Sequence, residues 1–274
     1  MIIAVIALGA YLSSCNKDKD TLPQQSEMTT ESTTTTLPTS SDVNVDDATF
    51  NNTSSNQRAG NTWIMNANSA NDIPTQMFGV DPKYKISYQH KKMNYINGFG
   101  KCSWTSYVIA ASCIIRGNYS WYSYPVNDTK VDQVMNACKN RQGSYANGAL
   151  ITALQWYCNT NDNFKLSCFQ KSTANSSSGR FLAIKYMLDH IYTEHSPFLV
   201  ISSSGNCGHY LVVHSIDWKK GGTGSMVYYT DCLYMGSNTS ISANLKSMDL
   251  SSFLNKMVVA TSYYNMLFLW PTGF

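Results

Sequence analysis

The chain has 274 residues, a net charge of +3 and 14% charged residues, and its basic residues are scattered. This balance excludes a strongly basic surface, so we expect no nucleic-acid partner. Its hydrophobic content of 43% supports a sizeable core, and the polar composition of residues 16–60 leaves residues 61–274 as one globular domain.

The first 15 residues are typical of an export signal. Residues 1–11 form an apolar stretch that is too short to span a bilayer. The segment Leu12-Ser13-Ser14-Cys15 resembles the lipobox of bacterial lipoproteins, and this implies a lipid-modified Cys15 as the membrane anchor. Residues 16–20 are similar to the export signals of surface lipoproteins in Bacteroidetes. The resemblance implies a location in the bacterial cell envelope, in the periplasm or on the outer-membrane surface.

Residues 16–60 predict a flexible tether. They are rich in Thr, Ser, Asn and Asp and contain almost no apolar residue. Such a segment cannot offset its ordering entropy by burial, so we expect it to hold the domain away from the membrane.

Hydrophobic spacing predicts helices and strands in the globular part. Apolar residues at i, i+3, i+4 and i+7, together with one continuous apolar run, predict helices at 102–115, 131–138, 150–157, 181–191 and 250–257. Segments rich in β-branched and aromatic residues predict strands at 198–202, 210–216, 226–229 and 265–270. Helices come first and strands second, which favours an α+β fold with a helical lobe facing an antiparallel sheet across a cleft.

A cysteine opens the first of these helices. The segment Gly100-Lys101-Cys102-Ser103-Trp104 places Cys102 after a glycine-punctuated loop, at the start of the apolar run. A helix N-terminus lowers the pKa of a thiol through its backbone N–H groups and its dipole. We therefore interpret Cys102 as the nucleophile of a cysteine hydrolase.

Eight cysteines in an exported chain also favour disulfides. With Cys15 and Cys102 set aside, the remaining six suit a disulfide framework, in which we predict that Cys158 and Cys168 close a local loop. Reduced, buried cysteines are the alternative. The six are Cys113, Cys138, Cys158, Cys168, Cys207 and Cys232.

Among the five histidines, His209 fits the base that a thiolate requires, because it follows a glycine and opens an apolar strand. His214 is an odd number of positions away, so a regular strand points it to the opposite sheet face. His190 and His195 lie on or just after a helix, and His90 lies in a basic loop. We expect these three side chains to be solvated.

A catalytic base needs an acceptor that orients its other ring nitrogen. Asp217 and Asp231 are the candidates. Asp217 lies farther along the same strand, about 26 Å from His209 in an extended chain. A hairpin that turns at residues 219–222 instead brings Asp231 beside His209. We therefore predict Asp231 as the third member of the site; the alternative is that it only forms a turn.

The segments around these residues resemble the papain-like superfamily, and most closely the bacteriocin-processing peptidase family and its bacterial relatives. In those relatives a strand ending in Gln precedes a Gly-Cys-Gly-Pro segment, a Gly-His-Tyr strand and a strand ending in Asp-Pro. Here the matching residues are Gln89, Cys102, His209 and Asp231, over about residues 84–235. The resemblance implies a two-lobed papain-like fold, with the nucleophile helix in an N-terminal helical lobe that packs against a C-terminal antiparallel sheet.

An oxyanion needs donors, and the N–H of Cys102 is one of them. An upstream side-chain amide is the second, with Gln89, Asn94 and Asn97 as candidates. The resemblance implies Gln89. The chain departs from the family at Ser103 and Trp104, which replace Gly and Pro after the nucleophile. It departs again at Ser215, which replaces the Gly after the His strand, and at Cys232, which replaces the Pro after the Asp.

Other chemistries have less support. The nucleophile segment also resembles CHAP-type peptidoglycan hydrolases, but in those domains the Cys and the His lie much closer together in sequence. Zinc ligation by Cys207, His209 and Cys232 lacks a fourth ligand and a standard spacing, so we predict neither a metal nor a cofactor.

These observations lead to one main hypothesis and two alternatives. We expect an exported, lipid-anchored, monomeric cysteine peptidase that hydrolyses peptide amide bonds in a peptide or protein substrate through a Cys-His-Asp triad and an acyl-enzyme. The alternatives are a CHAP-type peptidoglycan amidase or endopeptidase, and a catalytically inactive papain-like binding lipoprotein.

Overall fold

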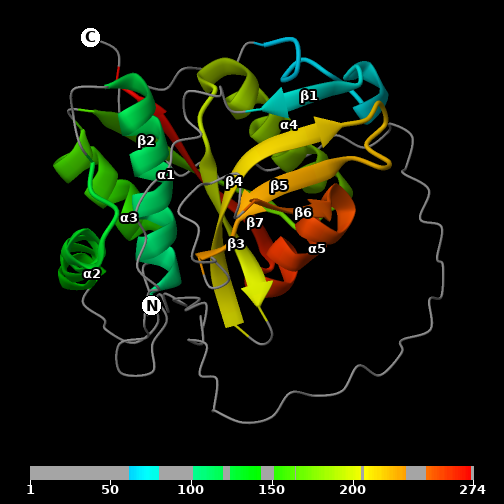
Figure 1. The fold of residues 1–274 in the computed structure, drawn as a ribbon. Helices are drawn as coiled ribbons and strands as arrows, with labels where there is room; N and C mark the ends of the chain where they lie inside the picture. The colour runs from blue at the N-terminus through cyan, green and yellow to red at the C-terminus, as the bar shows by residue number, and fades with distance from the viewer. Residues whose placement is uncertain are drawn as a thin grey trace, which may run out of the picture.

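A computed structural model describes residues 62–79, 101–119, 124–142, 151–163, 165–204, 207–232 and 245–272. Within them an antiparallel sheet forms the centre of the molecule (Figure 1). The strands follow the order β2-β7-β3-β4-β5-β6, and β1 pairs with β4. Their bounds are β1 Gln76–Gly79, β2 Leu166–Ala174, β3 Phe198–Ser204, β4 Cys207–Trp218, β5 Met226–Thr230, β6 Leu245–Asp249 and β7 Tyr263–Pro271.

Helices cover both faces of this sheet (Figure 1). Helices α1 (Cys102–Asn118), α2 (Asp128–Gln142) and α3 (Ile151–Tyr157) share one hydrophobic core with the sheet. Helices α4 (Ser177–Glu194) and α5 (Leu250–Thr261) share a second core on the opposite face. The sheet therefore lies between two helical layers, whereas the sequence predicted a helical lobe on one side only.

The strand alternation of β4 divides its side chains between the two cores. Tyr210 and Val212 belong to the core of α1, and Leu211 and Val213 belong to the core of α4 and α5. Because both faces are covered, the centre of β4, Tyr210–Val213, is an uninterrupted apolar run. The five predicted helices and four predicted strands are all present, most of them longer than expected.

The sequence did not predict strands β1, β2 and β6. Each lies at an edge of the sheet or pairs along one side only. Edge strands carry polar residues because one side of the strand has no partner, so β2 and β6 lack the apolar run of a central strand. Polar edge strands are hard to tell from loops in a sequence.

Local signals fix the ends of the last two helices. The side chain of Ser176 accepts a hydrogen bond from the backbone N–H of Gly179, and the Asp249 side chain accepts one from Ser252. The residues that follow α4 and α5, His195 and Ser262, adopt the left-handed conformation and cap the two helices. None of the helices in the described ranges is long and apolar enough to cross a membrane.

Two expectations about buried residues were wrong. Cys158 and Cys168 are free thiols, not a disulfide, and Cys168 Sγ instead donates to the backbone oxygen of Gln155 at 3.4 Å. His190 is buried between the rings of Phe198 and Phe268 and is not solvated. Helical position alone did not show that it faces the core.

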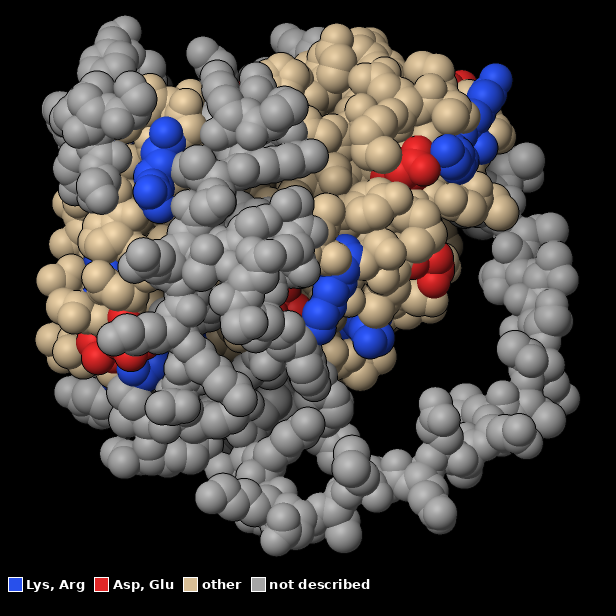
Figure 2. All heavy atoms as spheres, viewed as in Figure 1, with Lys and Arg blue, Asp and Glu red and all other residues tan. Residues whose placement is uncertain are grey.

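The remaining described cysteines outside the candidate site, Cys113 and Cys138, are also free and buried. The side chain of Cys207 and all of Cys15 lie outside the described part of the chain. On the face shown in Figure 2, Lys and Arg side chains stand in small groups, with acidic side chains near several of them.

Candidate active site

Cys102 is the first residue of α1 and is partly exposed. The helix behind it is buried from Ser103 to Ile115. One turn along, Ser106 Oγ donates a hydrogen bond to the backbone oxygen of Tyr210 at 2.9 Å. This bond joins the first turn of α1 to β4, one residue after His209, and so fixes the nucleophile candidate next to the base candidate.

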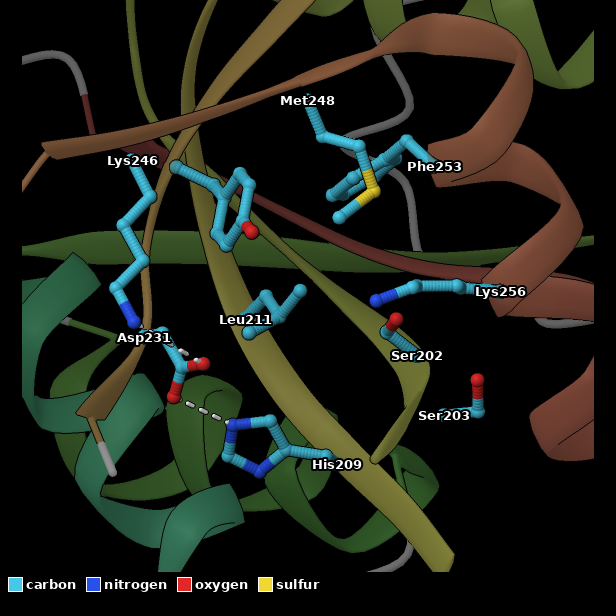
Figure 3. A pocket seen from close by; sticks show the side chains of 10 residues that line it. Ser202, Ser203, His209, Leu211, Asp231, Lys246, Met248, Phe253 and Lys256 are labelled. Atoms are coloured by element: carbon cyan, nitrogen blue, oxygen red, sulfur yellow. Dashed lines mark hydrogen bonds and ion pairs between the residues drawn. The ribbon is translucent and has the colours of Figure 1, made fainter. Parts of the chain in front are cut away.

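His209 and Asp231 meet because β4 and β5 form the predicted hairpin. Val212 pairs with Thr230 across the two strands, so the next residue, Asp231, lies level with the start of β4. The distance from His209 Nε2 to Asp231 Oδ1 is 2.7 Å (Figure 3). His209 is 2% exposed and Asp231 is 8% exposed, so water competes little for this hydrogen bond.

The second ring nitrogen of His209, Nδ1, is the one that remains for Cys102, because Nε2 is hydrogen-bonded to Asp231. Figure 3 shows one ring nitrogen directed to Asp231 and the other on the far side of the ring. This Nδ1 is buried and has no hydrogen-bond partner of ordinary geometry among the described residues. An Nε2–H that donates to Asp231 leaves Nδ1 with a free lone pair, which is the tautomer that accepts a proton from a thiol.

The pKa values of Cys102 and His209 shift in opposite directions. Burial raises the pKa of the Cys102 thiol, but hydrogen bonding to His209 and its positive charge outweigh burial, so the net pKa is lowered. Burial lowers the pKa of His209, but Asp231 and Cys102 favour the imidazolium, and the pKa rises to about 9. These shifts favour a thiolate–imidazolium pair.

The two competing residues lie elsewhere. His214 Nε2 is 2.7 Å from Thr230 Oγ1, inside the core, where a bulge interrupts the β4–β5 pairing. Asp217 Oδ1 accepts from Lys219 Nζ at 3.0 Å near the hairpin turn. The oxyanion candidates Gln89, Asn94 and Asn97, and the loop residue His90, lie outside the described residues.

The bulky residue of the nucleophile segment, Trp104, is buried. Trp104 is 1% exposed and packs in the core of α1, with the ammonium of Lys139 5.3 Å from its ring. A bulky residue two positions after Cys102 therefore points inward along the helix. The large side chain that the sequence analysis noted as a departure belongs to the core.

Three neighbours of the site were not predicted. Cys232 Sγ donates to the backbone oxygen of Cys102 at 3.8 Å, and Lys246 Nζ lies 3.9 Å from Asp231 Oδ2. The third neighbour, Ser106, joins α1 to β4 through its hydrogen bond to the backbone oxygen of Tyr210. Ser106 is four residues after Cys102 and shares its helix face, a spacing that the sequence already contained. Lys246 comes from β6, which no sequence signal identified.

His209, Asp231 and Cys232 are close enough together to suggest metal ligation. One potential ligand atom from each lies within 4.8 Å of the others. His209 Nε2 and Asp231 Oδ1 are already hydrogen-bonded to each other, however, and burial raises the pKa of the Cys232 thiol well above its usual value, which opposes the thiolate that a metal needs. These three residues therefore fit a hydrogen-bonded His209–Asp231 pair beside a neutral thiol better than a metal centre.

No family profile matches the chain, and no curated protein matches it. Among solved structures, the crystal structure of UfSP from C. elegans is 14% identical, over 73% of this chain and 35% of that chain, with a TM-score of 0.46. The chain thus spans well under two thirds of that structure, and a likeness this distant assigns neither family nor activity.

Proposed function

We propose that this protein is a cysteine peptidase with a papain-like active site, exported and lipid-anchored through Cys15. The observation that carries the proposal is the buried hydrogen bond of 2.7 Å between His209 and Asp231, together with the interaction of the same imidazole with Cys102. The lowered pKa of the thiol and the raised pKa of the imidazole support the same roles.

The first half of the reaction forms an acyl-enzyme. The Cys102 thiolate attacks the carbonyl carbon of a peptide bond and forms a C–S bond, and the carbonyl oxygen becomes an oxyanion. The imidazolium of His209 then protonates the amide nitrogen, the C–N bond breaks and the amine leaves. Asp231 keeps the ring oriented and stabilises its positive charge.

The second half releases the acyl group. Neutral His209 takes a proton from water, and the resulting hydroxide attacks the thioester carbon. The C–S bond breaks, the acid leaves and Cys102 returns as a thiolate beside the imidazolium. The N–H of Cys102 stabilises both oxyanions, because the first N–H groups of a helix have no intrahelical acceptor. Gln89 is the proposed second donor.

Thiol labelling tests the proposal directly. The full chain is treated with a peptide-based electrophile at about pH 7, where an ordinary thiol is mostly protonated, and the adduct is mapped by mass spectrometry. We expect labelling of Cys102, loss of the label in Cys102→Ser, and no effect of Cys113→Ser. Preferential labelling of any other cysteine contradicts the proposal.

Activity assays then separate the alternatives. Cleavage of casein or of a peptide library, lost in Cys102→Ser, supports a peptidase. Cleavage of purified peptidoglycan fragments alone places the protein with cell-wall hydrolases. Binding without turnover, unchanged in Cys102→Ser, supports a papain-like binding lipoprotein instead.

A further inference from the structure

A pocket of about 310 Å³ lies against the side of His209 that faces Asp231 (Figure 3). Strands β3 to β6 and helix α5 contribute its walls, so residues that are far apart in sequence converge there. Its lining residues are Ser202, Ser203, His209, Leu211, Tyr229, Asp231, Lys246, Met248, Phe253 and Lys256.

The charge of this pocket is positive. Two lysines and the His209 ring line it, against a single carboxylate, Asp231. That carboxylate is already engaged, because Oδ1 contacts His209 at 2.7 Å and Oδ2 lies 3.9 Å from Lys246. Lys256 has no ion-pair partner among the described residues, and Figure 3 shows its amine directed toward the space above Leu211 and Ser202.

Hydroxyl groups and apolar walls complete the lining. Ser202 and Ser203 present side-chain oxygens below Lys256, and they supply donors for an anion (Figure 3). Leu211, Met248 and Phe253 form the apolar part of the wall. A cationic end with hydroxyl donors beside an apolar wall matches a carboxylate that is carried on a short aliphatic stem.

We propose that this pocket binds a carboxylate on a short aliphatic stem, held by Lys256 with Ser202 and Ser203, and with Lys246 adding positive charge. The carboxylate belongs either to an acidic side chain of a peptide or to a free organic acid. Occupation does not require the Cys102 thiol, because Cys102 is not part of the lining. The pocket therefore excludes the proposed nucleophile, although it shares His209 and Asp231 with the proposed catalytic site.

Met248 provides a local probe of occupation. The full chain is labelled with ¹³C-methyl methionine, the Met248 signal is assigned with Met248→Leu, and glutarate is titrated as the free acid. N-acetylglutamate α-amide is titrated as the peptide-borne form. Glutaramide and N-acetylglutamine α-amide are the neutral counterparts. The buried methyl of Met257, in the same helix as Lys256 but outside the lining, is the internal reference.

We expect both acids to shift the Met248 signal in a saturable manner, and the neutral amides to bind about tenfold more weakly because they lose the attraction of both lysines. Lys256→Gln is expected to weaken binding about threefold to fivefold. Lys220→Gln, at an exposed turn lysine, is the matched control and is expected to change nothing. The acid that binds more tightly identifies the source of the carboxylate.

Equal binding of acids and neutral amides overturns the proposal, as does the absence of any saturable shift at Met248. If Lys256→Gln and Lys220→Gln change the binding affinity equally, the proposal is overturned as well. The titration is repeated with Cys102→Ala, which removes the proposed nucleophile. Retained binding in that variant shows that the pocket binds its ligand without Cys102, so a failure of the peptidase proposal would leave the pocket proposal standing.

Discussion

Asp231 lies 22 residues after His209, and its Oδ1 lies 2.7 Å from Nε2 of that histidine. The β4–β5 hairpin closes this separation, and the hydrogen bond is buried. The bond decides which ring nitrogen of His209 remains free for Cys102, so it links the folding of the sheet to the chemistry of the thiol.

Asp231→Asn tests this link. An amide that presents its NH2 group donates a hydrogen bond to Nε2, so the ring proton moves to Nδ1, the nitrogen that remains for Cys102; the substitution also removes the negative charge that stabilises the imidazolium. We expect kcat to fall about 10²-fold to 10⁴-fold while the protein remains folded. Peptide hydrolysis and a thermal melt measure the two effects. Asp217→Asn, which disrupts only the pair with Lys219, is expected to retain activity; similar losses in both variants argue against the role of Asp231.

The pH dependence of Cys102 alkylation follows from the paired pKa shifts. The pKa of Cys102 is lowered, so its thiolate and its reaction with iodoacetamide persist below the range of an ordinary thiol. The pKa of His209 is about 9, so the imidazolium that protonates the leaving amine disappears as the pH rises through that value. We expect peptide hydrolysis to decline there while alkylation does not.

His209→Ala is the control for the alkylation profile. Without the imidazole, burial acts on the Cys102 thiol without the main opposing interaction, so its pKa is expected to rise and alkylation to require more alkaline solution. An unchanged profile in this variant means that His209 does not activate the thiol.

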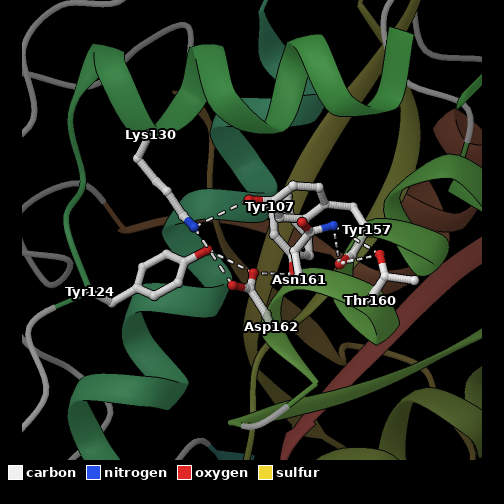
Figure 4. A network of polar contacts seen from close by, with 7 residues as sticks. All are labelled: Tyr107, Tyr124, Lys130, Tyr157, Thr160, Asn161 and Asp162. Atoms are coloured by element: carbon white, nitrogen blue, oxygen red, sulfur yellow. Dashed lines mark hydrogen bonds and ion pairs between the residues drawn. The ribbon is translucent and has the colours of Figure 1, made fainter. Parts of the chain in front are cut away.

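Helix α3 continues into a π-helix, Cys158–Asp162, that holds a buried polar network in place (Figure 4). Asp162 Oδ2 accepts hydrogen bonds from Tyr107 and Tyr124 at 2.7 and 2.9 Å, and its Oδ1 lies 3.6 Å from Lys130 Nζ. We expect Asp162→Ala to lower the free energy of unfolding by about 3 kcal/mol, because two buried tyrosine hydroxyls and the partly buried ammonium of Lys130 lose their shared partner. Urea unfolding checks this.

Tyr124→Phe removes one hydrogen bond of the same network and is expected to cost about 1–2 kcal/mol. Asp128→Asn, at the exposed start of α2, is expected to cost less than about 1 kcal/mol. If all three variants unfold at the same urea concentration, the network does not stabilise the fold.

Acid is expected to destabilise the fold through His190. Burial lowers the pKa of His190 to about 3, whereas the unfolded chain keeps it near 6.5. The unfolded state therefore binds the proton first as the pH falls below about 6.5, and stability declines by about 1.4 kcal/mol per pH unit toward the folded pKa. Urea unfolding at several pH values measures this slope. His190→Phe, between Phe198 and Phe268, is expected to flatten it; an identical slope in that variant contradicts the assignment.

Two glycines give a matched steric test. A Cβ on Gly179 would lie 2.2 Å from the backbone oxygen of Ala174, whereas a Cβ on Gly79 would lie 3.7 Å from the Cβ of Ser215. We expect Gly179→Ala to lower the free energy of unfolding by about 1–3 kcal/mol and Gly79→Ala to have little effect. Circular dichroism melts compare them, and equal melting temperatures contradict the predicted clash.

The central elements could be predicted from the sequence because their burial pattern is strong. Helix α1 and strand β4 are apolar over most of their length, and the glycines at the β4–β5 turn, Gly221 and Gly222, have positive φ angles that suit a tight reversal. These features were enough to place Asp231 beside His209 without a structure.

The features that the sequence did not predict depend on tertiary contacts that a single sequence does not show. Lys246 lies near Asp231 although it belongs to a polar edge strand. His190 is buried because the face of α4 that carries it packs against the sheet. Cys158 and Cys168 are close in sequence, but both are free thiols, and Cys168 Sγ donates to the backbone oxygen of Gln155 instead. The arrangement of the helices in two layers, one on each face of the sheet, likewise depends on which face each helix covers, and a single sequence does not show this.

The order of the elements along the chain has a consequence for the timing of activity. The thiol belongs to the early helix α1, whereas the groups that activate it belong to β4 and to the residue after β5, much later in the chain. A polypeptide that has not yet folded its C-terminal half therefore carries Cys102 without the interactions with His209 that lower the pKa of its thiol. In the proposed peptidase, the nucleophile is assembled only when β4 and β5 have folded against α1.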